Sequence, residues 1–167
     1  MHKHRVSLLF LTTVVVLLAM AEATAAKLDT ANLWSTINIC DTKKHPNKLG
    51  VRGRMPSDGH KSHTLWMKFI AQYKNTQTNK WQKVVSTKFE ELGDGSRSWR
   101  SSGKTFTITF AKNAPKGTHF TFRGLVKYQW RNGSTVVLSK QRTTTSGHPA
   151  MNSDPPGYSA ATCVITK

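Results

Sequence analysis

The sequence predicts an immunoglobulin-like antiparallel β-sandwich of seven or eight strands, with a small antiparallel β-barrel as the alternative. Three observations predict this fold class. Apolar and polar residues alternate with a period of two along several segments. Turn-forming Gly, Pro, Asn and Asp residues separate these segments. No stretch between residues 27 and 167 has a sustained helical period.

The first 26 residues differ from the rest and are expected to be a secretion signal peptide. A positively charged start precedes an apolar run over Val6–Met20, and small residues follow up to residue 26. We expect cleavage within 23–26, which leaves a single secreted domain over 27–167 without a transmembrane helix. The alternative is an uncleaved membrane anchor, although the apolar run is short for a bilayer span.

Three segments carry the clearest strand signal: Thr64–Lys74, Thr105–Ala111 and Thr118–Arg131. In the last of these, Phe120, Phe122 and Trp130 share one face, so we expect Trp130 in the core. Weaker strand candidates are Leu33–Cys40, Lys48–Arg54, Lys80–Thr87, Thr135–Arg142 and Ala161–Thr166. The Asn132-Gly133 pair predicts a two-residue hairpin turn, and 93–96 is expected to be a loop.

Two cysteines, Cys40 and Cys163, lie 123 positions apart near the ends of the expected domain. An exported protein meets an oxidising environment, so a disulfide that joins the first and last strands is expected. Two free buried thiols are the alternative. Neither cysteine has another cysteine or histidine at metal-ligand spacing, so no metal site is expected there.

The chain is strongly basic, with 25 Lys and Arg residues, 8 Asp and Glu residues and a formal net charge of +17. Such a charge favours association with polyanions, for example an anionic cell-wall polymer or polysaccharide. No dedicated nucleic-acid motif is present. The alternative is that the charge serves solubility and has no dedicated partner.

The pattern of reactive residues does not indicate an enzyme, and we expect no catalytic residue, metal or cofactor. Acidic residues are scarce, and Glu90–Glu91 are neighbours that would point to opposite faces of a strand or lie in an exposed acidic turn. His60 and His63 fall in a segment that resembles a loop, among positive charges. A cleft that holds Asp41, His45 and Asp154 would favour an enzyme.

Tryptophans beside cations are the most informative pattern. Residues two apart in a strand share a face, which places Trp66 with Lys68 and Trp81 with Lys83. The candidate ligand-binding residues are Trp66, Lys68, Trp81, Lys83, Arg97, Trp99 and Arg100. Aromatic rings beside cations can stack sugars or bases while the cations meet anionic groups. The alternative is a core role, with cation stems lying over tryptophans. Trp81 and Trp99 are the better candidates for exposed rings.

Residues 39–47 and 50–56 near the start of the domain, and 154–165 near its end, resemble a group of small secreted actinobacterial proteins without an assigned function. The resemblance implies an immunoglobulin-like sandwich, and the paired cysteines of the group match Cys40 and Cys163. It implies no catalytic or binding residues. The sequence thus predicts an extracellular, non-enzymatic binding domain, with a structural or protein–protein interaction module as the alternative.

Overall fold

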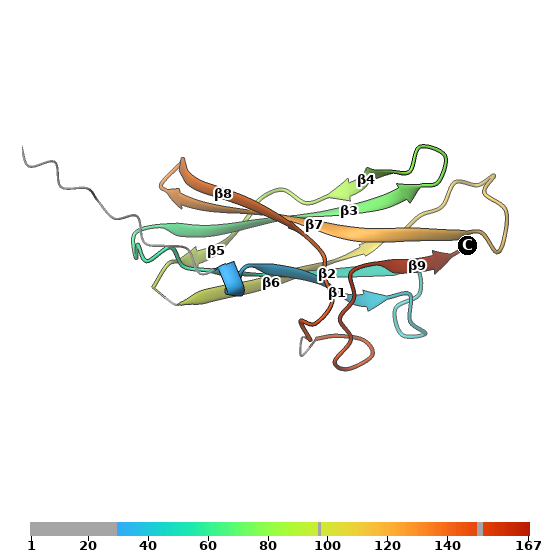
Figure 1. Cartoon of the computed structure of the whole chain (residues 1–167), viewed down its shortest axis with the longest axis horizontal. Coiled ribbons are helices and arrows are strands. Elements are labelled where there is room, and N and C mark those ends of the chain that lie inside the picture. Colours follow the sequence, from blue (N-terminus) through green and yellow to red (C-terminus); the bar gives the residue numbers. More distant parts are fainter. Residues whose placement is uncertain (1–29, 97, 150–151) are drawn as a thin grey trace, which may run out of the picture.

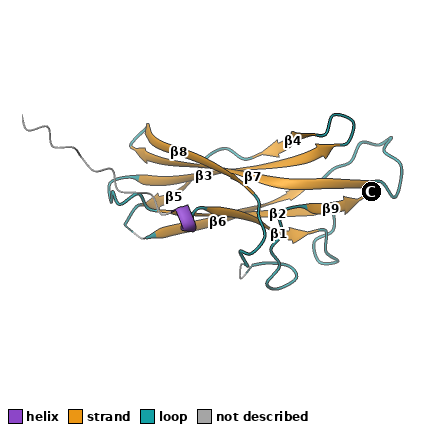
Figure 2. Ribbon diagram, in the orientation of Figure 1, coloured by secondary structure: helices purple, strands orange, loops and turns teal. Residues whose placement is uncertain are grey.

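Two antiparallel β-sheets pack face to face in the computed structural model, which describes residues 30–96, 98–149 and 152–167 (Figure 1). This arrangement confirms the predicted β-sandwich. Among the described residues the helical element is a single 3-10 turn, η1 (Thr30–Asn32), and no helix is long and apolar enough to cross a bilayer (Figure 2). The predicted signal peptide and Arg97 lie outside the described residues.

The smaller sheet has three strands in the order β1-β2-β6. These strands are β1 (Trp34–Cys40), β2 (Lys48–Pro56) and β6 (Trp99–Thr107). In the larger sheet two long strands, β3 (Thr64–Asn75) and β7 (His119–Asn132), form the central antiparallel pair. The other side of β3 pairs with β4 (Lys80–Ser86) and β5 (Glu90–Asp94). The other side of β7 pairs with β8 (Thr135–Thr143) and β9 (Cys163–Thr166).

The structure corrects three predictions about strands and turns. The segment around Glu90–Glu91 was expected to be an exposed acidic turn, but it forms strand β5. It pairs with β3 at an edge of the sheet, where charged residues are tolerated. β6 runs over Trp99–Thr107 and not 105–111, because pairing with β2 extends it through Ser, Gly and Arg residues of weak strand preference. Asn132 pairs with Thr135, so the hairpin turn consists of Gly133 and Ser134, and Gly133 supplies the positive φ of 57°.

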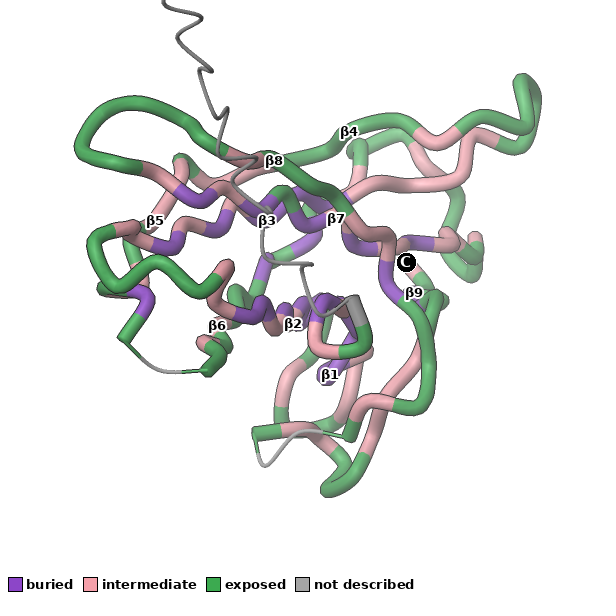
Figure 3. Tube along the Cα trace, turned by 60° about the vertical axis from the view of Figure 1, so that its left-hand side comes forward, coloured by how far each residue is buried: buried purple, intermediate pink, exposed green. Residues whose placement is uncertain are grey.

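The core lies between the sheets, where the facing strands bury alternate side chains (Figure 3). Trp130 is fully buried, as predicted, and its indole nitrogen donates to the Pro56 carbonyl at 2.9 Å. Tyr128 is also fully buried, and its hydroxyl donates to the Trp34 carbonyl at 2.6 Å. Burial raises the pKa of the Tyr128 phenol far above its usual range, so it stays a donor. Both bonds run from the larger sheet to the strands or strand ends of the smaller one.

The free edge of β1 is covered by the long loop between β8 and β9, through residues 144–149 and 152–162 (Figure 1). Ile37 and Ala160 exchange two backbone hydrogen bonds, and Thr145 donates to the Ser35 carbonyl at 2.8 Å. An uncovered edge strand is a template for unwanted pairing. The loop therefore completes the smaller sheet on that side.

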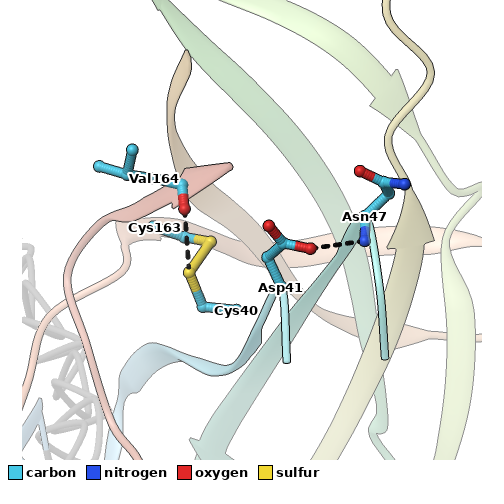
Figure 4. Close-up of a disulfide and its surroundings, with 5 residues drawn as sticks. All are labelled: Cys40, Asp41, Asn47, Cys163 and Val164. Carbon is cyan, nitrogen blue, oxygen red and sulfur yellow. Dashed lines mark hydrogen bonds between the residues drawn. A yellow bond between two sulfur atoms is a disulfide. The ribbon is translucent and has the colours of Figure 1, made fainter. Parts of the chain in front are cut away.

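The predicted disulfide joins Cys40 at the end of β1 to Cys163 at the start of β9 (Figure 4). β1 belongs to the smaller sheet and β9 to the larger one, so the bond also links the two sheets. Next to it, the Asp41 carboxylate accepts a hydrogen bond from the Asn47 backbone at 2.7 Å, which closes the β1–β2 turn (Figure 4).

Candidate binding surfaces

The outer face of the larger sheet brings together four of the predicted site residues: Trp66, Lys68, Trp81 and Lys83. The strand registers place cations from the neighbouring strand beside them. Lys68 on β3 lies opposite Lys127 on β7, and Gln72 lies between Lys83 on one side and Arg123 on the other. Directly opposite residues share a sheet face, so these side chains all point away from the core.

We call this surface the basic face. Its cations are Lys68, Lys74, Lys83, Arg123, Lys127 and Arg131, and its aromatic residues are Trp66, Trp81 and Phe89. Glu91 lies opposite Trp66 and places a carboxylate on the same side of the sheet. Within the described residues, none of the six cations forms an ion pair with a carboxylate. The face is therefore strongly positive.

Trp66 is half-buried and is covered by an arginine from the adjacent strand. The Arg131 guanidinium lies 4.2 Å from the centre of the Trp66 ring and 5.3 Å from that of Phe89. The Gln129 amide oxygen accepts two hydrogen bonds from Arg131, at 2.6 and 3.0 Å. Lys68, the cation that the sequence placed beside Trp66, lies instead 5.9 Å from the Phe89 ring. Arg131 is thus held over Trp66 by Gln129, while the half-buried Lys68 lies near Phe89.

Trp81 repeats this arrangement at the other end of the face. The Arg123 guanidinium lies 4.3 Å from the Trp81 ring centre, and Lys74 lies 5.6 Å from it. Arg123 also donates to the Gln72 amide oxygen at 2.8 Å. Partial burial lowers the pKa of Arg123, although a guanidinium stays charged at neutral pH. Trp81 is half-buried beneath these cations and was expected to be more exposed.

A second cluster lies on the outer face of the smaller sheet. Trp99 is 43% exposed, as predicted, and the Arg54 guanidinium lies 4.1 Å from its ring centre. Across β2 from Trp99, the Trp34 ring stacks on His148 with centroids 4.7 Å apart and planes 4° from parallel. Burial lowers the pKa of His148, which favours the neutral imidazole there. A cavity of about 310 Å³ lies between the two tryptophans.

Arg100, another predicted site residue, connects the two sheets. Its Nε donates to the Leu92 carbonyl at 3.1 Å, and its Nη2 lies 3.1 Å from the Asp94 carboxylate. Both partners belong to β5, whereas Arg100 belongs to β6. Its geometry indicates a structural contact between the sheets.

Sequence reasoning missed five residues of the basic face and three of the smaller sheet: Lys74, Phe89, Arg123, Lys127 and Arg131 on the larger sheet, and Trp34, Arg52 and Arg54 on the smaller one. Strand alternation already placed Arg123 on the solvent side of its segment. The alternation of Arg52 and Arg54 with apolar neighbours in β2 was a similar signal. What alternation cannot show is which strand lies next to which.

The residues considered for catalysis or metal binding form contacts within one loop or between two loops. His63 Nδ1 lies 2.7 Å from the Asp58 carboxylate. His45 Nε2 lies 3.9 Å from the Asp154 carboxylate, which Thr42 also contacts. In the described part of the chain, no three His, Cys, Asp or Glu side chains gather into a group that could hold a metal ion.

Comparisons with models of protein families, with curated proteins and with solved structures give no match.

Proposed function

We propose that this protein is a secreted, non-enzymatic binding module that attaches to an anionic extracellular polymer through the basic face. One observation carries the proposal: six cations share the outer face of one sheet, and none pairs with a carboxylate among the described residues. An anionic chain that lies across the sheet would supply the missing partners.

The shape of the basic face favours a polymer as the ligand. Its cations come from three adjacent strands, β4, β3 and β7, which are spaced about 4.8 Å apart in a sheet. The cations therefore form an array that is several strands wide, and they do not converge on one point. An extended chain with repeated negative groups can meet several of them at once, whereas a single small anion cannot.

The Lys68–Lys127 pair supports a binding role. These two lysines lie directly opposite each other on β3 and β7, where like charges destabilise a sheet. A carboxylate at either position would favour folding. A local arrangement that costs stability is typical of a functional surface.

The arginines of the face are already ordered before a ligand binds. Arg131 and Arg123 each rest on a tryptophan and donate to a glutamine. A side chain that is fixed in advance loses less conformational entropy on binding. The free donors of these guanidinium groups remain for sulfate, phosphate or carboxylate groups.

The proposal can be tested with dextran sulfate, which carries charge but no carboxylate, and with neutral dextran as the uncharged counterpart. The test variant combines Lys68→Gln, Lys83→Gln and Lys127→Gln. One ion contact near 4 Å in water contributes about 1 kcal/mol, so we expect affinity at low salt to fall on the order of 100-fold. Binding by the unmodified protein should weaken steeply as salt is raised.

The matched control removes the same charge from exposed loop lysines, through Lys43→Gln, Lys44→Gln and Lys116→Gln. We expect this variant to keep most of its affinity for dextran sulfate, because its basic face is unchanged. Equal losses in the two variants would show that net charge, and not this face, causes binding. Failure of the unmodified protein to bind at low salt would overturn the proposal and favour a protein–protein interaction module.

A further inference from the structure

We infer that the smaller sheet carries a discrete binding site for one acidic sugar unit of the hexuronic acid type. The site, called here the tryptophan–arginine groove, is lined by Trp34, Arg52, Arg54, Trp99, Ser101, Pro149 and Asn152. It lies on the opposite face of the sandwich from the basic face and stands on different residues. It does not depend on the proposed function.

The groove is built from one row of paired residues and one loop. Arg54 on β2 lies opposite Trp34 on β1 and Ser101 on β6, so a single row crosses all three strands. Arg52 shares the face two residues earlier on β2. Residues 149 and 152, from the long loop over β1, form the wall that makes this face concave.

The groove holds two guanidinium groups without an anionic partner. Within the described residues neither Arg52 nor Arg54 pairs with a carboxylate, and the Nε atoms of both are buried without a hydrogen-bond partner. Arg52 Nη2 donates to the Ser101 hydroxyl at 3.3 Å. Partly desolvated charges without a counter-charge cost free energy. A carboxylate in the groove would offset this cost through charge-assisted hydrogen bonds to the terminal nitrogens.

Two indole rings flank these arginines and are held by their surroundings. Trp34 stacks on His148, and its backbone carbonyl accepts the Tyr128 hydroxyl. Trp34 is half-buried, whereas Trp99 is 43% exposed, and the Arg54 guanidinium lies 4.1 Å from the centre of the Trp99 ring. Exposed, ordered aromatic rings offer large apolar contact at little entropic cost. The C–H-rich face of a sugar ring suits such a surface, and its hydroxyls suit Ser101 and Asn152.

The short distance between the Arg54 guanidinium and the Trp99 ring favours a ligand with a carboxyl group on its sugar ring. Arg54 lies against Trp99, so a ligand that uses both must carry its negative charge next to its ring. A carboxyl group bonded directly to a sugar ring meets this condition. A phosphate on an exocyclic carbon places its charge farther from the ring. The volume of about 310 Å³ lies at the lower end of ligand pockets and fits a small ligand.

Isothermal titration of the protein with D-glucuronate tests the inference, with D-glucose as the neutral analogue and glucose 6-phosphate as the phosphorylated one. For a ligand of this size we expect a dissociation constant on the order of 1 mM. Glucose and glucose 6-phosphate should each bind at least about tenfold more weakly than glucuronate. Glucose lacks the negative charge, and glucose 6-phosphate carries its charge too far from the ring.

Two variants locate the site. Arg54→Gln should weaken glucuronate binding by about tenfold or more, the loss expected for a charge-assisted hydrogen bond. Trp99→Ala, at an exposed position, should weaken it several-fold while the thermal unfolding midpoint stays near that of the unmodified protein. Lys127→Gln on the basic face is the matched control and should leave glucuronate binding unchanged.

The inference is overturned if titration to glucuronate concentrations well above about 1 mM shows no saturable binding. It is equally overturned if glucose or glucose 6-phosphate binds as tightly, or if the two groove variants bind glucuronate like the unmodified protein. Failure of dextran sulfate to bind would count against the basic face alone, because that probe carries no ring carboxylate.

Discussion

The two outer faces of the sandwich use the same residue types and present them differently. On the basic face, Trp66 and Trp81 are half-buried beneath arginines, which in turn donate to glutamines. On the smaller sheet, Trp99 remains 43% exposed, and the Nε of Arg54 has no partner among the described residues. One face is a broad array of charges, and the other is a small concave site.

The difference comes from what surrounds each sheet. The basic face is bordered by strands, so its side chains stand side by side across β4, β3 and β7. The smaller sheet is bordered by the described parts of the β8–β9 loop, 144–149 and 152–162, which cover β1 and contribute a wall to the groove. A loop that protects a sheet edge thus also shapes a cavity. We therefore expect the two faces to bind different ligands and to respond separately to substitution.

Removal of the disulfide should have the largest effect on stability and should leave the separate binding properties of the two faces unchanged. The Cys40–Cys163 bond closes a loop of 123 residues between the two sheets. Replacement of both cysteines by alanine should cost about 4 to 5 kcal/mol of unfolding free energy and lower the melting temperature by about 10 °C or more. Calorimetry measures this loss. Below the new melting temperature, dextran sulfate and glucuronate should still bind, since neither surface contains a cysteine. Loss of both activities in a folded variant would show that the surfaces depend on this link.

Tyr128→Phe should weaken ligand binding at the smaller sheet and leave binding at the basic face unchanged. It removes the hydroxyl that donates to the Trp34 carbonyl, and the expected cost is about 1 kcal/mol of stability, measured by denaturant unfolding. Trp34 then loses a support, so glucuronate binding should weaken. Dextran sulfate binding should be unchanged, because Tyr128 points into the core and away from the basic face. An equal effect on both ligands would contradict independent faces.

His148 should give the smallest effect, seen as a change of stability with pH. Burial lowers its pKa below the usual 6.5, so between these two values the unfolded chain binds more protons than the folded one. Its contribution to stability is therefore fully present above pH 6.5 and is lost as pH falls through the lowered pKa. His148→Phe keeps a ring over Trp34 but cannot titrate. Melting temperatures at about pH 5 and about pH 8 should show a smaller acid-induced decrease in the variant. Identical decreases would show that His148 does not contribute.

Much of the fold follows from local patterns in the sequence. Trp130 shares its alternation with two phenylalanines and is buried, and Trp66 and Trp81 share their faces with the predicted lysines. The cation that covers each ring could not be predicted, because Arg131 and Arg123 reach these tryptophans through the β3–β7 register. Such pairing joins segments far apart in the chain, and alternation within one segment carries no information about it.

The groove was hidden for two further reasons. The strand that carries Trp99 was expected to start at residue 105, so its pairing with β2, which sets Ser101 opposite Arg54 and Trp99 opposite Pro56, could not be seen. The wall from the long loop depends on hydrogen bonds to β1, which composition does not encode. Alternation along β2 could have placed Arg52 and Arg54 on one face, but sequence reasoning did not single them out.

A footprint of lysine reactivity tests the central claim most directly. The protein would be acetylated with and without saturating dextran sulfate at low salt, and the modification of each lysine measured by mass spectrometry. Our account predicts that the polymer protects Lys68, Lys83 and Lys127 and leaves the loop lysines Lys43, Lys44 and Lys116 reactive. Uniform protection of all six, or protection of the loop lysines alone, would contradict it.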